Sequence, residues 1–181
     1  MHKDVLKILV SEEELHSRVK ELAARIDADY AGKNPLFIGI LKGSFIFMSD
    51  LVRAVTLDSA VDFMAVSSYG GGTNSSGRIK IIKDLDEDIE GRDVIIVEDI
   101  LDSGRTLSHL IGYLESRKPE SLRICVLMDK PARREIEVKV DPEYIGFTIP
   151  DSFVVGYGLD YDQSYRNLPY VGILRPEVYS K

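Results

Sequence analysis

The chain has 181 residues, the size of one domain, and 44% of them are apolar, which suits an ordinary buried core and argues against disorder. Its 23 basic and 30 acidic residues give a net charge of −7, so no broad nucleic-acid-binding surface is expected. The single Cys125 excludes an internal disulfide and a Cys-based metal cluster. No apolar run predicts a signal peptide or a membrane span, so we expect a cytoplasmic protein without membrane contact.

The N-terminal third of the chain predicts a helix, a strand and a second helix. Ser11 and Glu14 form the S-x-x-E pattern that caps a helix, and apolar residues then recur at spacings of four and three as far as Ile26. The run 36–41 is almost wholly apolar, as expected for a strand that is covered on both faces. Apolar positions within 45–55 indicate the next helix.

The remainder of the chain alternates mainly between strands and helical patterns. A helix is expected at 107–114, closed by Pro119. Strands are expected at 61–66, 79–82, 94–97, 122–128, 144–147, 153–156 and 171–174. This order predicts an α/β fold with a mostly parallel twisted sheet flanked by helices, and a ligand site beyond the carboxyl ends of its strands.

Residues 94–107 carry the most informative pattern in the chain. Four β-branched residues form an apolar strand that leads into Glu98 and Asp99, and a loop and a helical pattern follow. Carboxylates at the end of a strand can accept hydrogen bonds from ribose hydroxyls or hold a hydrated Mg²⁺. The alternative is that both acids are solvated and that the loop is only a helix cap.

The loop after these acids offers donors suited to a monophosphate. Gly104 lets a ligand approach the backbone closely, and the N–H groups from about Ser103 to Thr106 face outward at a helix N-terminus, where partial positive charge favours an anion. Ser103 and Thr106 add hydroxyl groups. Arg105 adds a cation, although its side chain could also point into water. We therefore predict a phosphate site at residues 102–106.

In this order of strand, acid pair, loop and helix, the segment resembles the phosphoribosyl pyrophosphate (PRPP) signature of the type I phosphoribosyltransferases. Within that family the chain resembles the hypoxanthine-guanine phosphoribosyltransferases over about residues 36–174. The resemblance implies that residues 102–106 bind the 5′-phosphate and that Glu98 and Asp99 contact ribose or Mg²⁺. It also implies that Asp102 is the catalytic base for the proton at purine N7.

Lys42 and Gly43 also follow a buried strand and open a helix, so they could bind a second anion or form an ordinary turn. They resemble the pyrophosphate loop of the hypoxanthine-guanine enzymes. In that family the peptide that joins the residues matching Leu41 and Lys42 can be cis.

Residues 67–78 are rich in Ser and Gly, and by composition alone they could form a simple surface loop. They resemble the mobile lid of the family, in which Ser68 and Tyr69 close over the reacting centre. A lid has a physical purpose in such an enzyme, because a ribosyl cation would be captured by water unless water is excluded.

Two further segments resemble the purine-binding part of these enzymes. Lys130 ends a strand, where it would donate to the exocyclic oxygen on purine carbon 6. The resemblance implies that Phe153 stacks on the base, that the backbone of Val154 meets the other edge of the ring, and that Asp160 binds Mg²⁺. Arg166 would contact pyrophosphate. Without the resemblance, Phe153 would be assigned to the core and Arg166 to the surface.

The resemblance implies a Mg²⁺-dependent enzyme of purine salvage that transfers the phosphoribosyl group of PRPP to N9 of hypoxanthine or guanine. It implies a single domain over 1–181, with a core at about 36–150, a hood from about 1–10 and 151–181, the lid, and assembly into a homodimer or homotetramer. One alternative is a xanthine-preferring enzyme. Another is a non-enzymatic PRPP-sensing regulator, which the acidic charge and the lack of a basic face disfavour.

Overall fold

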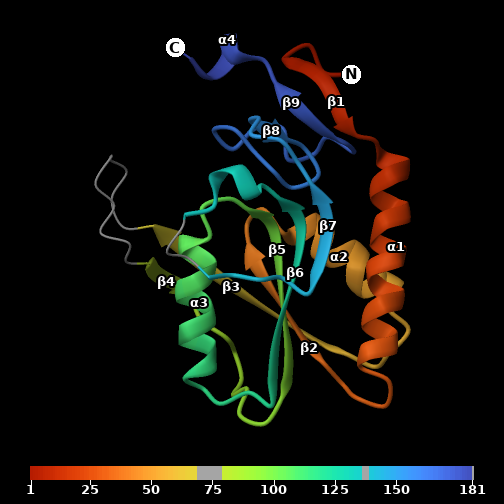
Figure 1. Ribbon diagram of the computed structural model, residues 1–181, viewed down its shortest axis with the longest axis vertical. Coiled ribbons are helices and arrows are strands. Elements are labelled where there is room, and N and C mark those ends of the chain that lie inside the picture. The colour runs from red at the N-terminus through yellow and green to blue at the C-terminus, as the bar shows by residue number, and fades with distance from the viewer. Residues whose placement is uncertain (69–78, 136–138, 181) are drawn as a thin grey trace.

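A six-stranded sheet forms the centre of the computed structural model, which describes residues 1–68, 79–135 and 139–180 (Figure 1). Its strand order is β4-β3-β2-β5-β6-β7. The parallel strands are β2 (Leu36–Leu41), β3 (Ala60–Ser68), β5 (Asp93–Leu101), β6 (Ser121–Asp129) and β7 (Tyr144–Thr148). The edge strand β4 (Ile79–Lys83) pairs antiparallel with β3. The predicted mostly parallel sheet is confirmed.

Helices cover both faces of this sheet, as predicted (Figure 1). The helices α1 (Glu12–Asp29) and α2 (Phe45–Ala54) contact each other on one face, and α3 (Arg105–Glu115) covers the other. The predicted capping box is present at the start of α1: Ser11 Oγ accepts from the Glu14 N–H, and the Glu14 carboxylate accepts from the Ser11 N–H at 2.8 Å. None of the described helices is long and apolar enough to cross a membrane.

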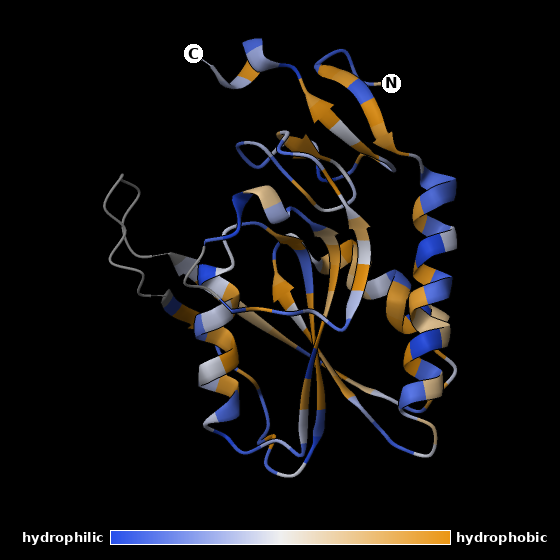
Figure 2. Cartoon of the chain, viewed as in Figure 1, coloured by the Kyte–Doolittle hydropathy of each residue, from blue (hydrophilic) through white to orange (hydrophobic). Residues whose placement is uncertain are grey.

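The central strands are apolar because their two faces pack against different helices. Phe37 and Ile95 belong to the core cluster that includes α1 and α2, whereas Ile38 and Ile96 belong to the cluster that includes α3. Successive strand residues point to opposite faces, so one strand supplies both clusters. Figure 2 shows the result as apolar strands between helices whose polar faces point outward. Cys125 is buried in the same core, and burial raises the pKa of its thiol.

Strands from both ends of the chain form a second, three-stranded sheet above the first one (Figure 1). It contains β1 (Val5–Val10), β9 (Val171–Leu174) and β8 (Val154–Val155), all paired antiparallel. The short helix α4 (Pro176–Tyr179) follows β9. The sequence pattern did not predict β1 or α4. In β1, Leu6 and Ile8 are exposed and the register with β9 shifts twice, so its apolar residues do not mark one buried face.

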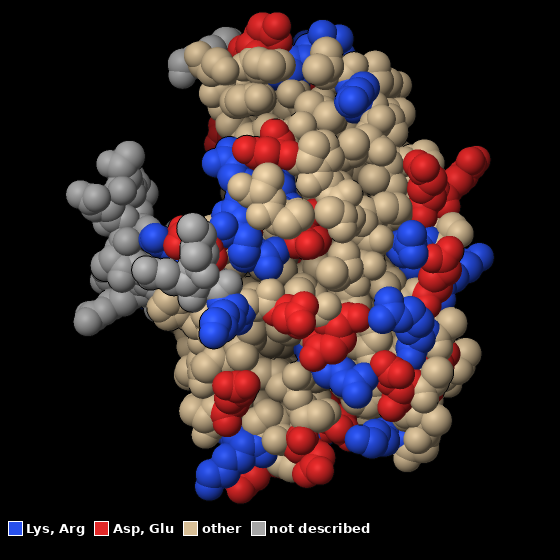
Figure 3. All heavy atoms as spheres, in the orientation of Figure 1, with Lys and Arg blue, Asp and Glu red and all other residues tan. Residues whose placement is uncertain are grey.

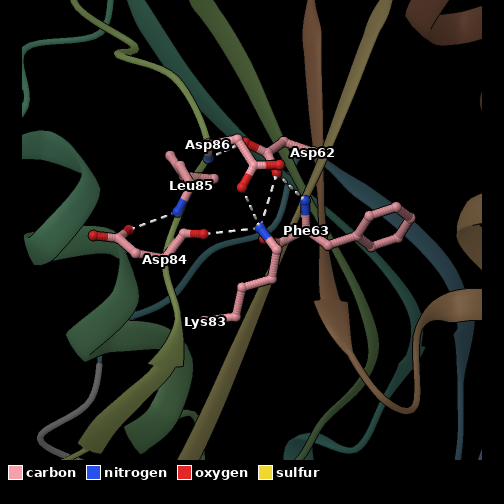
Figure 4. Close-up of polar contacts among 6 residues, drawn as sticks. All are labelled: Asp62, Phe63, Lys83, Asp84, Leu85 and Asp86. Atoms are coloured by element: carbon pink, nitrogen blue, oxygen red, sulfur yellow. Dashed lines mark hydrogen bonds and ion pairs between the residues drawn. The ribbon is translucent and has the colours of Figure 1, made fainter.

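Lys83 anchors the edge strand to the chain that follows it (Figure 4). Its Nζ atom donates to the carbonyl oxygens of Phe63 and Asp84 at 3.0 and 2.9 Å and to the Asp86 carboxylate at 3.0 Å. The buried Asp62 carboxylate accepts from the Asp86 N–H at 2.8 Å. The acidic loop after β4 therefore begins with an ordered polar network before its exposed part.

Truncation of Leu110 should test the importance of the α3 face. Leu110 is fully buried against the sheet, so Leu110→Ala leaves a cavity and should lower the free energy of unfolding by about 2–5 kcal/mol. The measurement is urea unfolding followed by circular dichroism. Ile82→Ala is the matched control, because Ile82 is 65% exposed, and it should change stability by less than about 0.5 kcal/mol. Equal losses in the two variants would contradict this packing.

Candidate active site

A cavity of about 760 Å³ lies where the carboxyl ends of β5 and β6 meet the three-stranded sheet. Six of the predicted site residues line it: Asp99, Asp102, Lys130, Phe153, Val154 and Asp160. They come from segments up to about 60 residues apart in the chain, and the sheet topology brings them together at the edge where α/β folds bind ligands. Lys42, Gly43, Glu98, Arg166 and residues 103–106 do not line this cavity.

The sequence predicted that Glu98 and Asp99 lie at the end of a strand, but the structure places both acids inside β5. The reason is that β5 continues to pair with β6 as far as Leu101. The Oε2 atom of Glu98 is buried and has no hydrogen-bond partner among the described residues. Burial, and secondly the charge of Asp99, raise the pKa of Glu98 well above its usual range. The Glu98 carboxyl group is therefore not freely solvated, and its buried oxygen has a hydrogen-bonding capacity that no described residue satisfies.

Asp99 is held at a tight junction of three segments. Its Oδ1 atom accepts from the Ile100 N–H at 2.7 Å. A Cβ atom on Gly43 would lie 1.6 Å from Asp99 Oδ2, and a Cβ atom on Gly158 would lie 2.1 Å from the Gly43 carbonyl oxygen. A side chain at position 158 would collide with backbone, and one at position 43 would displace the Asp99 carboxylate. Burial raises the pKa of Asp99 to about 6, and the opposing effects include the Ile100 N–H and the charge of Arg166.

Charged groups from the predicted pyrophosphate region gather around this junction. Arg166 lies 2.8 Å from Asp160 Oδ1 and donates to the Gly158 carbonyl at 2.7 Å. The Gln163 N–H donates to Asp160 Oδ2 at 2.8 Å, and Lys42 Nζ donates to the Gln163 side chain at 3.1 Å. The Leu41–Lys42 peptide bond is cis. The structure thus places Lys42, Gly43 and Arg166, which do not line the main cavity, beside Asp99 and Asp160, which do.

The predicted phosphate loop ends at Gly104, which is the N-cap residue of α3 with a φ of 82°. The N-cap position is thus occupied by glycine and not by Asp102 or Ser103. Glycine has no side chain to cap the helix, and the contact that the structure describes from the Arg105 N–H to Ser103 Oγ is long, at 3.4 Å, so this helix N-terminus suits an anion. The Arg105 guanidinium does not point into the loop, because its Nε atom donates to the Glu135 carboxylate at 2.5 Å. Asp102 is exposed and lines the cavity.

The predicted purine-binding residues share one wall of the cavity. Lys130 is buried, with only 6% of its surface exposed, and its Nζ atom lies 4.0 Å from Asp151 Oδ1. Arg133 donates to the same oxygen at 2.7 Å. One face of Phe153 stacks on Tyr179, with ring centroids 4.9 Å apart and planes inclined by 23°. The sequence patterns gave no signal for Asp151 or Tyr179, because only the fold brings these side chains to Lys130 and Phe153.

The predicted lid lies largely outside the described residues. Tyr69 and the rest of 69–78 fall there, and of Ser68 the structure describes only the backbone, which pairs with Ile79 between β3 and β4. The lid remains a prediction.

In the described ranges, no group of three or more His, Cys, Asp and Glu side chains is placed to hold a metal ion. The predicted metal ligands are carboxylates, Glu98, Asp99 and Asp160, and two of them lie close enough that Asp160 raises the pKa of Asp99. Mg²⁺ is commonly held by one or two carboxylates together with waters and the phosphates of a ligand. The oxygen donors at this junction fit that mode of binding and not a site made of protein ligands alone.

The pKa of Asp99 predicts a pH-dependent cost of folding. Folding raises this pKa from 3.8 to about 6. Between these two pH values the folded protein therefore binds more protons than the unfolded chain. As a result, the contribution of Asp99 to the free energy of unfolding falls as pH rises from about 4 to about 6. In buffer with a chelator, Asp99→Asn should raise the free energy of unfolding by about 2–3 kcal/mol at about pH 7 and by almost nothing near pH 4. Asp58→Asn, at an exposed position, is the control. A gain that does not change with pH would contradict this prediction.

Comparison with known proteins agrees with this geometry. Residues 9–162 match the phosphoribosyl transferase domain family. The chain is 52% identical to the hypoxanthine-guanine phosphoribosyltransferase of Bacillus subtilis over 99% of this chain and 98% of that protein. It is 54% identical over its whole length to the bifunctional protein TilS/HprT of Listeria monocytogenes, of which it spans only 28%.

Solved structures give the same result. The hypoxanthine phosphoribosyltransferase of Staphylococcus aureus superposes with a TM-score of 0.95 and 52% identity, covering 100% of this chain and 97% of that one. The corresponding transferase of Trypanosoma cruzi superposes with a TM-score of 0.94 and 43% identity, covering 99% and 96%. The resemblance inferred from residues 94–106 is thereby confirmed, as is the type I fold. The chain belongs to the phosphoribosyl transferase family.

Proposed function

We propose that the chain is an enzyme of purine salvage that transfers the phosphoribosyl group of PRPP to N9 of hypoxanthine or guanine and releases pyrophosphate. One observation carries this proposal: a single cavity joins the β5 acid and its loop to a buried lysine and an exposed aromatic ring, through Asp99, Asp102, Lys130 and Phe153. A sugar phosphate and a planar base are the two ligands that such walls suit.

The two phosphate groups of PRPP would bind to different loops. The open N-terminus of α3 and the hydroxyls of Ser103 and Thr106 would hold the 5′-phosphate. Glu98 and Asp99 would accept hydrogen bonds from the ribose hydroxyls. Lys42, Gly43 and Arg166 would bind pyrophosphate, and we propose that Asp160, with Glu98 and Asp99, would help to hold Mg²⁺ there. When bound, Mg²⁺ would neutralise charge on the leaving pyrophosphate.

The base would lie between the ribose and the aromatic side of the cavity. Phe153 is 38% exposed and has one face against Tyr179, so its remaining surface can meet a purine. Lys130 would donate to the oxygen on purine carbon 6, and the backbone of Val154 would meet the other edge of the ring. Adenine carries an amino group at carbon 6, which is itself a donor, so a cationic donor disfavours it.

In the reaction, the bond between ribose C1 and pyrophosphate would lengthen and give C1 oxocarbenium character before purine N9 attacks. Asp102 is exposed to the cavity, where its carboxylate would accept the proton at purine N7 as general base. We propose that Ser68 and Tyr69 close over this centre and exclude water.

We propose further that residues 1–181 act as one domain, with a core at about 36–150, a hood from about 1–10 and 151–181, and a lid at 67–78. The sheet built from β1, β8 and β9 supports the hood. Assembly into a homodimer or homotetramer and a cytoplasmic location are expected for this function. Acidic and basic side chains lie interspersed over the visible face in Figure 3, and the net charge is −7, which does not favour a nucleic-acid partner.

A steady-state assay with PRPP and Mg²⁺ tests the proposed function directly. Hypoxanthine, guanine, xanthine and adenine are offered separately, and pyrophosphate and the nucleotide are measured. We expect turnover of hypoxanthine or guanine and little of adenine. Efficient use of xanthine alone would point to the xanthine-preferring alternative, and no turnover of any purine would overturn the proposal.

Replacement of Asp102 should separate chemistry from binding. Asp102→Asn keeps the size of the side chain but removes the base, so kcat should fall by roughly 10²–10⁴-fold while the KM for PRPP changes little. Asp58→Asn is the control, because Asp58 is exposed and lies outside the cavity. An unchanged kcat would end the assignment of Asp102 as the base.

Replacement of Lys130 should weaken purine recognition. Lys130→Met keeps a long side chain and removes the donor to the carbon-6 oxygen, so the KM for hypoxanthine should rise roughly 10–100-fold and the preference over adenine should shrink. Lys20→Met on the exposed side of α1 is the matched control. If discrimination against adenine survives in Lys130→Met, another group must read carbon 6.

A further inference from the structure

Two adjacent residues that follow β6, Arg134 and Glu135, contact the outer side of the phosphate loop (residues 102–106). The guanidinium of Arg134 binds three acceptors from three segments: the Asp102 carbonyl oxygen at 3.2 Å, the Val140 carbonyl oxygen at 3.1 Å and the Asp129 carboxylate. The next residue, Glu135, donates its N–H to the Ser103 carbonyl oxygen at 3.3 Å. Its carboxylate also accepts from Arg105 Nε at 2.5 Å. The loop is therefore contacted at Asp102, Ser103 and Arg105 by two adjacent residues, Arg134 and Glu135.

These contacts fix the direction of the amides that face the ligand. In a trans peptide the C=O and N–H groups point in opposite directions. The Asp102 carbonyl shares its peptide with the Ser103 N–H, and the Ser103 carbonyl shares its peptide with the Gly104 N–H. Because both carbonyls point toward Arg134 and Glu135, both N–H groups point away from them, toward the side on which α3 begins.

We propose that Arg134 and Glu135 are positioning residues for the 5′-phosphate, which hold the two loop carbonyls outward so that the Ser103 and Gly104 amides face the phosphoryl oxygens. The inference rests on the proposed function, because it assumes that this loop binds a phosphate. Neither residue touches the ligand in this arrangement. Their effect passes through the loop backbone.

The chemistry of Arg134 suits this role better than a lysine would. Its acceptors require donors from Nε, Nη1 and Nη2 in one plane, which a guanidinium supplies and an ammonium group does not. Its side chain and that of Asp129 are largely buried, with 19% and 13% of their surfaces exposed, so the ion pair is shielded from water. These shielded contacts of Arg134 restrict the loop backbone. A loop held in this way presents its amides without reorganisation when the phosphate binds.

The test compares binding of GMP and guanosine by calorimetry in the full chain, because the two ligands differ only by the 5′-phosphate. Arg134→Met should weaken GMP binding by roughly tenfold or more and leave guanosine binding within about twofold. Arg134→Lys should recover little of the loss, since it cannot bridge three acceptors. Arg117→Met removes an arginine that is paired with Asp84 and Tyr113 away from the cavity, so it controls for a general loss of stability.

A second pair of variants isolates the Glu135 N–H and serves if Arg134→Met fails to fold. Glu135→Ala removes the contact with Arg105 but keeps the N–H, whereas Glu135→Pro also removes the N–H. Arg134 has a ψ of 130°, which a following proline accepts. The proline variant should bind GMP several-fold more weakly than the alanine variant. Equal GMP affinities in the variants and the wild type would overturn the proposal, whereas a wild type that binds GMP no better than guanosine would instead refute the phosphate site.

Discussion

The burial of Asp99 against the backbone of Gly43 is the contact on which the proposed site depends. It joins β5 to the turn after β2, and Gly158 lies against the carbonyl oxygen of the same Gly43, so three segments of the chain meet at one junction. No side chain larger than hydrogen fits at Gly43 without moving the acid. The positions of Lys42 and Arg166 relative to β5 therefore follow from backbone packing and not from flexible side chains alone.

This junction favours function over stability. Burial raises the pKa values of Glu98 and Asp99, which means that the folded chain holds two carboxyl groups where their charged forms are disfavoured. Arg166 and the Ile100 N–H offset only part of that cost. Groups held in this way are typical of ligand sites, because a cation or a set of hydroxyl donors from the ligand can supply the missing interactions.

Much of the fold and part of the site could be predicted from sequence, for identifiable reasons. Strands covered on both faces carry continuous apolar runs, and the acids and glycine after Val97 stand out against them. The contacts of Tyr179 with Phe153 and of Arg134 with Asp102 could not be predicted, because they join residues that lie 26 and 32 positions apart in the chain, respectively. Strand β1 was missed because its exposed leucine and isoleucine do not follow a strand pattern with one buried face.

The two ends of the proposed PRPP site are built on different physical principles. The loop after β5 offers neutral amides and hydroxyls at a helix N-terminus, and Arg134 donates a hydrogen bond to the Asp102 carbonyl oxygen of this loop. The junction around Asp99 instead places Lys42 and Arg166 beside acidic side chains, and Arg166 is already paired with Asp160, so its own charges do not attract a polyanion strongly. We therefore expect that a phosphoryl group would bind at the first end through the protein alone. The pyrophosphate end needs positive charge that arrives with the ligand, which is the physical reason to expect a divalent cation there.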